Sequence, residues 1–155
     1  MMRTVLGVGL ALCLGLARPA LAAPLGGGSF MQEDPAPAAA EAQRAFDEGT
    51  RQMKAKRYAE AVAAFQRAVK ARPDFAEAYS NLGFSLRNTG KVDQAIAAYQ
   101  EAIRLKPDLA EAHEYLGGAY LMKGNKQAAL EQHRILERMN PKLAAELMEE
   151  IQKAP

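Results

Sequence analysis

The sequence predicts an all-α protein, a solenoid of three helix-turn-helix units followed by a C-terminal cap helix. Two observations support this prediction. Residues 76–109 realign with 110–143 without a gap at a spacing of 34, and 42–75 falls into the same columns. Glycine recurs at that spacing, with Gly83 on Gly117. A fixed period of this length with two helical patterns per unit is typical of stacked repeats, in which each unit buries its apolar face against the next.

Glycines mark where the first helix of a unit stops. Gly90 and Gly124 follow the first helix of the second and third units, where a residue with positive φ is favoured. Lys56 takes the same place in the first unit, and we expect it to cost about 1 kcal/mol if it keeps that conformation. The six predicted repeat helices span 42–54, 58–71, 76–89, 92–105, 110–123 and 126–139.

Acidic residues mark where two of these helices start. Asp74 is followed three residues later by Glu77, and Asp108 by Glu111. This spacing predicts capping boxes, in which the Asp side chain accepts from a backbone N–H and the Glu reaches back. The acids also suit the positive end of a helix.

A seventh helix is predicted at about 142–152. Asn140 can cap it, and Pro141 can occupy its first position. An apolar stripe at i, i+4 and i+8 follows, formed by Leu143, Leu147 and Ile151. We expect residues 144–155 to form a cap helix and tail that keep the end of the stack soluble. A docking helix is the alternative.

Small residues fall where the two helices of a unit are predicted to face each other. Gly83 is placed opposite Ala95, and Gly117 opposite Ala129. The distance between two packed helices depends on the side chains at the contact. We therefore expect facing positions with almost no side-chain volume to let the two backbones approach closely.

The first 22 residues have the pattern of a secretory signal peptide. Arg3 gives a positive start, an apolar run covers 4–17, and small residues at 20–22 permit cleavage after Ala22. The run is shorter than the about 20 residues that a membrane span needs, although a retained anchor is the alternative. We therefore expect 1–22 to be removed, the mature chain to have no membrane span, and the protein to be exported to a bacterial periplasm.

The residues that follow, 23–41, are rich in Gly, Pro and Ala and hold few large apolar side chains, which predicts a disordered linker. Cys13 is the only cysteine and lies in the signal segment. A mature chain without cysteine excludes disulfides, thiol catalysis and cysteine-based metal sites.

The charge of the chain gives no reason to expect nucleic acid as a partner. The sequence carries 20 basic and 18 acidic residues, and removal of Arg3 and Arg18 with the signal peptide leaves 18 of each (20 minus 2). These charges are interspersed along the chain. Binding to nucleic acid or to an anionic membrane depends on a concentrated positive field, which this sequence does not supply.

Over residues 42–143 the chain resembles the tetratricopeptide repeat (TPR) family, in the period and in the Gly, Ala and Pro positions of each unit. The resemblance implies a right-handed superhelix whose inner groove is lined by the first helix of each unit and holds a peptide or a partner's helix. Transferring the family's groove positions gives these residues: Phe46, Thr50, Met53, Glu77, Asn81, Phe84, Asn88, Glu111, Glu114, Tyr115 and Met122.

The chemistry of these groove positions narrows the expected ligand. Asn81 resembles the groove Asn with which many TPR proteins hold a ligand backbone, because an amide both donates and accepts. TPR domains that clamp a C-terminal carboxylate carry Lys and Arg in the groove, whereas this sequence has Phe46, Thr50, Glu111 and Tyr115 there. We expect a segment with apolar and basic side chains instead, since Glu77, Glu111 and Glu114 need counter-charges. Binding on the convex face is the alternative.

No catalytic motif stands out in the sequence, and its glycines are explained by turns and close packing. The two histidines, His113 and His133, replace Tyr79 and Tyr99 of the preceding unit and are predicted to be neighbours. They form either a metal-binding pair or a pH-sensitive hinge, or they do the packing work of tyrosine. Two ligands without a third make a poor metal site, which favours packing.

The sequence therefore predicts a non-enzymatic adaptor or scaffold without a cofactor, whose partner is a protein or peptide held in the concave groove. A self-associating structural module that forms weak homo-oligomers is one alternative. A metal-binding protein built on the histidine pair is another.

Overall fold

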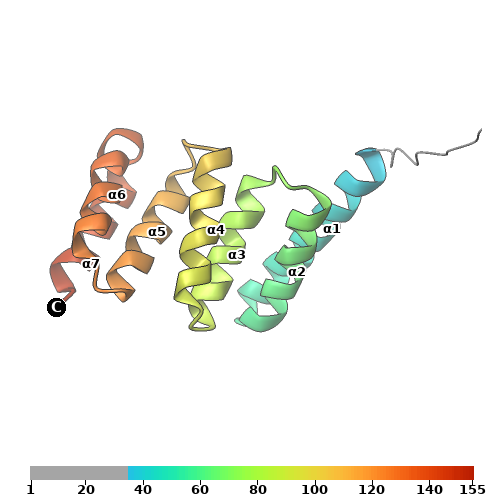
Figure 1. Ribbon diagram of the computed structural model, residues 1–155, viewed down its shortest axis with the longest axis horizontal. Coiled ribbons are helices and arrows are strands. Elements are labelled where there is room, and N and C mark those ends of the chain that lie inside the picture. The colour runs from blue at the N-terminus through green and yellow to red at the C-terminus, as the bar shows by residue number, and fades with distance from the viewer. Residues whose placement is uncertain (1–34) are drawn as a thin grey trace, which may run out of the picture. The chain divides into compact units, whose positions relative to one another are not determined.

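The structure, a computed structural model, describes residues 35–155, with side chains from residue 37 onward. This part of the chain consists of α-helices joined by short turns, without a strand (Figure 1). The expected signal peptide 1–22 and residues 23–34 of the expected linker lie outside the described residues. The helices are α1 (Pro35–Lys54), α2 (Tyr58–Ala71), α3 (Ala76–Asn88), α4 (Val92–Leu105), α5 (Ala110–Met122), α6 (Lys126–Met139) and α7 (Pro141–Lys153).

The first helix is longer than predicted. It begins at Pro35 and not near residue 42, so that the expected disordered linker 23–41 is wrong over 35–41. Proline is favoured at the first helical position, and the alanines at 38–40 are strong helix formers. Ala42 and Ala45 are buried in a small cluster with Phe75, which anchors this end of α1 to the repeats.

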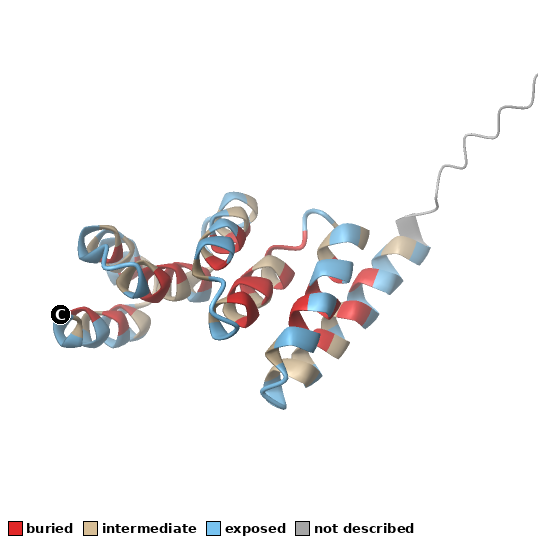
Figure 2. Ribbon diagram, turned by 60° about the horizontal axis from the view of Figure 1, so that its bottom comes forward, coloured by how far each residue is buried: buried red, intermediate tan, exposed pale blue. Residues whose placement is uncertain are grey.

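The helices are arranged as an inner and an outer layer. Each helix packs against the next along the chain, and α1 also contacts α3, α3 contacts α5, and α5 contacts α7. Within residues 35–155, α2, α4 and α6 make no such contacts with one another. The first helices of the units therefore form the inner layer, while the second helices are spread along the outside. The buried faces of the helices are turned toward their neighbours (Figure 2).

A large side chain from the second helix lies directly on a glycine of the first. A Cβ added to Gly49 would lie 2.7 Å from Phe65, and a Cβ added to Gly83 would lie 2.6 Å from Tyr99. The predicted neighbour of Gly83 is Ala95, whereas the atoms nearest to a Cβ at this position belong to the Tyr99 ring. The small residue at Ala95 is fully buried in the same cluster, one turn before Tyr99. The glycine makes room for a ring.

The third unit fills the same space from the cap helix. His133 stands where the earlier units have Tyr99 and Phe65, and the side chain found over Gly117 is Leu147 of α7. Leu147 and its neighbour Ile151 are buried, as the predicted apolar stripe requires. The α7 helix thus completes the packing of the last repeat as well as covering its end.

The turns inside the three units share one conformation. The second residue after the end of the first helix has positive φ in each unit: 58° at Lys56, 80° at Gly90 and 72° at Gly124. The next residue donates its N–H to the carbonyl five positions back, in the pairs Arg57–Gln52 (2.9 Å), Lys91–Leu86 (3.0 Å) and Asn125–Tyr120 (2.9 Å). This is the hydrogen bond of a Schellman motif. Lys56 therefore keeps the conformation of the glycines in the other two units, which is the condition for the expected cost of about 1 kcal/mol.

The predicted capping boxes at Asp74 and Asp108 are wrong. The N-cap residues of α3 and α5 are Phe75 and Leu109, one position later, and neither helix has a side-chain cap. The backbone satisfies one of the free N–H groups at the start of α3, since Ala78 donates its N–H to the carbonyl of Phe75 at 3.1 Å. A carboxylate is not needed where the backbone already satisfies the donor.

The start of α7 follows the prediction. The Asn140 side chain accepts from the N–H of Leu143 at 3.3 Å, and Pro141 occupies the first helical turn. None of the helices between Pro35 and Lys153 is both long and apolar enough to cross a lipid bilayer.

Gly83→Ala should destabilise the protein by about 1–3 kcal/mol, because the new methyl group would collide with the Tyr99 ring in a packed core. The sign distinguishes this effect from helix propensity, which alone would make Ala stabilising by about 0.5–1 kcal/mol. Chemical denaturation of both proteins measures the difference. An unchanged or increased free energy of unfolding would contradict the packing described here.

Lys56→Gly should stabilise the protein by up to about 1 kcal/mol, because glycine adopts positive φ without the steric cost that Lys56 bears. Gly90→Lys is the matched control and should lose a similar amount, since nothing lies within 4 Å of a Cβ at that position and only the backbone is affected. Thermal melts of the two variants test the pair.

Candidate functional site

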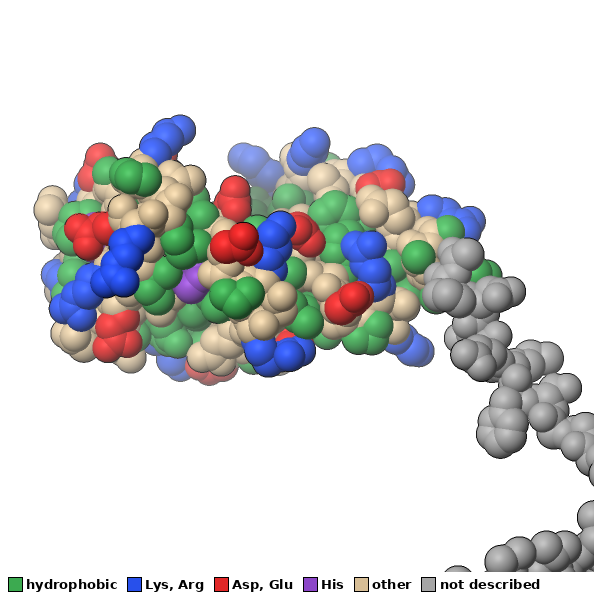
Figure 3. Space-filling view, turned by 90° about the horizontal axis from the view of Figure 1, so that it is seen from above, with side chains coloured by type: hydrophobic (Ala, Val, Ile, Leu, Met, Phe, Trp, Pro, Cys, Tyr) green, Lys and Arg blue, Asp and Glu red, His purple; other side chains and the backbone are tan. Residues whose placement is uncertain are grey.

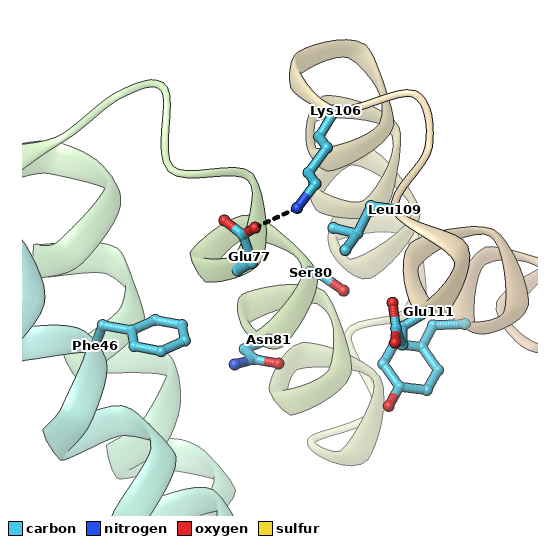
Figure 4. A pocket seen from close by; sticks show the side chains of 8 residues that line it. Phe46, Glu77, Ser80, Asn81, Lys106, Leu109 and Glu111 are labelled. Atoms are coloured by element: carbon cyan, nitrogen blue, oxygen red, sulfur yellow. Dashed lines mark hydrogen bonds and ion pairs between the residues drawn. The ribbon is translucent and has the colours of Figure 1, made fainter.

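A hollow of about 420 Å³ opens on the inner helix layer. Its walls come from α1, α3, α5 and the turn between α4 and α5 (Figure 4). The residues that line it are Phe46, Glu77, Ser80, Asn81, Lys106, Leu109, Glu111 and Tyr115. A groove on this layer is what the resemblance to the TPR family implied.

Five of the predicted groove residues line this hollow, namely Phe46, Glu77, Asn81, Glu111 and Tyr115. Figure 4 shows the Asn81 amide in the middle of the hollow, without a bond to the other side chains drawn. Its oxygen can accept from a ligand backbone and its NH2 group can donate to one.

Phe84 lies outside the hollow and extends its aromatic surface. The centroid of the Phe84 ring is 5.3 Å from that of Tyr115 and 6.1 Å from that of Tyr58. Tyr115 in turn lies 5.9 Å from Tyr99. These distances are typical of tilted and edge-to-face aromatic pairs.

Four other predicted groove residues are not part of the hollow. Thr50 donates to the carbonyl of Phe46 at 2.9 Å, and Asn88 donates to the carbonyl of Phe84 at 2.8 Å, so that both polar groups are bonded to their own helix. Met53 packs against the apolar core. Met122 is 59% exposed. Sequence columns alone do not show that such a side chain folds back on its own helix.

Lys106 is a lining residue that the sequence did not predict. Its Nζ lies 2.9 Å from Glu77 Oε1, and this hydrogen bond is the largest of the causes that lower the pKa of Glu77. The expectation that Glu77 needs a counter-charge from a ligand is therefore wrong. Lys106 follows the outer helix α4, whereas the groove positions of the family come from the first helix of each unit.

Glu114 is the groove carboxyl group whose pKa is raised. Burial between the helices is the largest cause that raises its pKa from 4.5 to about 7, and the next is the Glu150 carboxylate on α7. Glu146 and Glu111 also raise this pKa, whereas the Arg87 guanidinium lowers it. The sequence placed Glu114 in the groove but not the α7 carboxylates beside it.

The two histidines do not form a pair. His113 is buried, with Nδ1 2.8 Å from Gln132 Oε1 and Nε2 2.9 Å from the carbonyl oxygen of Pro107. His133 lines a separate hollow between α6 and α7. The prediction that the two rings are neighbours is wrong, because Gln132 takes that place. His113 thus serves the packing and hydrogen bonding of the third unit.

Metal and nucleic-acid sites find no support on the described part of the chain. No group of three or more His, Cys, Asp or Glu side chains between residues 37 and 155 could hold a metal ion. Acidic and basic side chains are interspersed on the face drawn in Figure 3, without a large patch of one sign. The features that remain are the hollow, its aromatic surface and the carboxylates of α5 and α7.

Glu114→Gln should stabilise the protein at pH 8 and have little effect near pH 5. The pKa of Glu114 is higher in the folded state than its ordinary 4.5, so that stability falls as pH rises from about 4.5 to about 7. The variant removes this penalty, which we expect to be on the order of 1 kcal/mol once solvent screening of a half-exposed group is included. Urea denaturation at both pH values measures it, with the exposed Glu149→Gln as control. An equal effect at both pH values would contradict the assignment.

The family model for the tetratricopeptide repeat matches residues 46–109 and 85–144. No curated protein sequence matches this chain significantly. Solved structures do resemble it. The TPR domain of Arabidopsis OM64 is 18% identical with a TM-score of 0.71, and the match covers 75% of this chain and 98% of that one.

Two similar structures are complexes, one with pHsp70 and one with an HSP70 peptide. The TPR2B domain of yeast Sti1, in a complex with pHsp70, is 26% identical with a TM-score of 0.69, and the match covers 74% of this chain and 96% of that one. The second TPR domain of human RPAP3, in complex with the HSP70 peptide SGPTIEEVD, is 21% identical with a TM-score of 0.68, covering 77% and 98%. Since the two family matches together run from residue 46 to 144, well over half of the sequence, this chain belongs to the tetratricopeptide repeat family.

Proposed function

We propose that the protein is a non-enzymatic adaptor that binds a segment of a partner protein in the hollow of its inner helix layer. One observation carries this proposal: the Asn81 amide, without a bond to the other side chains drawn in Figure 4, lies in a hollow of about 420 Å³ that Phe46 and Tyr115 also line. Apolar walls with a few placed polar groups are what a binding site for a peptide or small ligand requires.

The similar structures support the class of partner. The human RPAP3 domain is solved with a peptide and the yeast Sti1 domain with pHsp70, and both have the fold of this chain. At 21% and 26% identity the likeness concerns the fold. The partner of this chain therefore follows from its own groove residues. The proposal includes export of the protein, which is supported by the sequence pattern of residues 1–22.

Selection from a random-peptide phage library on the purified protein tests the proposal. Peptides selected on the wild type should lose about tenfold or more in affinity with Asn81→Ala, because the amide that holds the peptide backbone is removed. Tyr115→Ala should have a comparable effect through lost aromatic contact. Fluorescence polarisation with the synthetic peptides measures both.

Two exposed residues of the outer helices supply the controls. Gln66→Ala on α2 and Gln94→Ala on α4 should leave the affinity unchanged. A selection that yields no specific peptide would refute the adaptor function. Peptides that are sensitive to Gln66 or Gln94 but not to Asn81 would move the binding site to the convex face.

A further inference from the structure

At the α7 end of the groove, the described residues include more carboxylates than basic groups that pair with them. Lys106 pairs with Glu77, and Lys142 lies 3.8 Å from Glu146. Three carboxylates of α5 and α7 are left without an ion pair to any described residue, and we call them the acidic end of the groove: Glu111, Glu114 and Glu150. Their mutual repulsion is felt at Glu114, whose pKa the other two raise.

The protein's own guanidinium group already packs beside this acidic end. Arg87 of α3 lies 5.4 Å from the ring centre of Phe84 and 5.8 Å from that of Tyr115, within reach of a cation–π contact. A Cβ on Gly118 would lie 2.8 Å from Arg87 Nη1 and 3.2 Å from Glu150 Oε2. The missing side chain at Gly118 therefore lets a cation and a carboxylate approach each other over the α5 backbone. Aromatic faces and carboxylates together are the surroundings that a guanidinium or ammonium group prefers.

A buried hydroxyl without a partner points toward the same end of the groove. Tyr99 is fully buried, and its hydroxyl has no hydrogen-bond partner among the described residues. The ring extends from α4 across Gly83 to Tyr115. Burial raises the pKa of the Tyr99 hydroxyl, the Arg87 guanidinium lowers it, and Tyr115 and the Glu114 carboxylate raise it. Buried polar groups are nearly always satisfied, so the described side chains at this end of the groove leave one buried hydroxyl without its usual partner.

We propose that the acidic end of the groove binds an arginine or lysine side chain of the partner segment, between the Tyr115 ring and the carboxylates of Glu114 and Glu150. This inference rests on the proposed function and adds the charge of the partner. The preference is opposite to the acidic HSP70 peptide SGPTIEEVD that is bound to the human RPAP3 domain. Three unpaired carboxylates against one Arg87 would repel such a peptide and attract a cationic one.

The peptides selected on the wild-type protein supply the first test. They should be enriched in Arg or Lys next to apolar residues, and replacing that residue by Gln should reduce affinity about tenfold. Binding should weaken as salt is raised. Binding should strengthen between pH 6 and pH 8, because Glu114 loses its proton in this range. The other charged groups that act on the pKa of Glu114 are Arg87, which lowers it, and Glu111, Glu146 and Glu150, which raise it.

The double variant Glu114→Gln/Glu150→Gln is the decisive comparison. It should lose the preference for Arg or Lys over Gln and the dependence on pH, while it keeps the fold and the residual binding through Asn81. Glu149→Gln, on the exposed side of α7 where Lys153 pairs with Glu149, should change neither.

The outcomes separate this inference from the proposed function. The cation site would be refuted by selected peptides without Arg or Lys, or by cationic peptides that bind the double variant as well as the wild type. In either case, loss of affinity with Asn81→Ala would still support binding in the groove. A wild type that selects no peptides refutes both. Peptides rich in Asp and Glu would show that the groove binds the opposite charge.

Discussion

A large side chain that lies on a bare glycine backbone sets the packing of every repeat in this protein. Phe65 covers Gly49, Tyr99 covers Gly83, and Leu147 covers Gly117, at distances that leave no room for a methyl group. Burying a side chain of this size stabilises the fold by about 1.5–3 kcal/mol. In Tyr99 an unpaired buried hydroxyl offsets about 1–3 kcal/mol of that gain. Stability alone would therefore favour Phe at position 99, as the first unit has at position 65.

In this packing, large side chains of other helices lie on glycines of the inner helices, and this determines which side chains the inner helices expose. The outer helices α2 and α4 supply the rings that fill the first two units, and α7 supplies Leu147 for the third. The inner helices therefore do not need their own aromatic residues for that purpose. Phe46, Phe84 and Tyr115 are only partly buried and lie along the inner layer. Phe46 and Tyr115 pack against the core, and Phe84 packs against Tyr115. A row of half-exposed rings on one rigid layer is a surface that can bind another chain with little rearrangement. The same contact thus stabilises the repeats and leaves the groove available.

The repeat period was sufficient to predict the helices, the turns and the inner layer, because these depend on residues that recur at fixed positions. Lys56 shows the strength of that constraint, since it takes a conformation that favours glycine. The capping of α3 and α5 was predicted wrongly from Asp74 and Asp108, because a backbone turn satisfies the same donors one residue later. Local motifs compete with such turns, and sequence spacing does not decide between them.

The composition of the groove was harder to predict than its position. Glu77 was correctly placed there, but its partner Lys106 follows an outer helix and is 29 residues away. Thr50 and Asn88 occupy groove columns and yet bond to their own helices. Gln132, and not the predicted His133, contacts the His113 ring. These outcomes depend on side-chain rotamers and on contacts between units, neither of which a column in a repeat records.

The α7 helix joins a favourable packing contact to an unfavourable electrostatic one. Leu147 and Glu150 are three residues apart, so they lie on neighbouring parts of one helix face. When α7 docks to bury Leu147 over Gly117, it brings Glu150 over Gly118 and next to Glu114. The gain from a buried leucine, about 1.5–3 kcal/mol, exceeds the charge penalty of on the order of 1 kcal/mol, and the docked helix is stable despite the repulsion. The fold can therefore maintain unpaired carboxylates at one end of the groove, where a cationic ligand would relieve the repulsion that the packing creates.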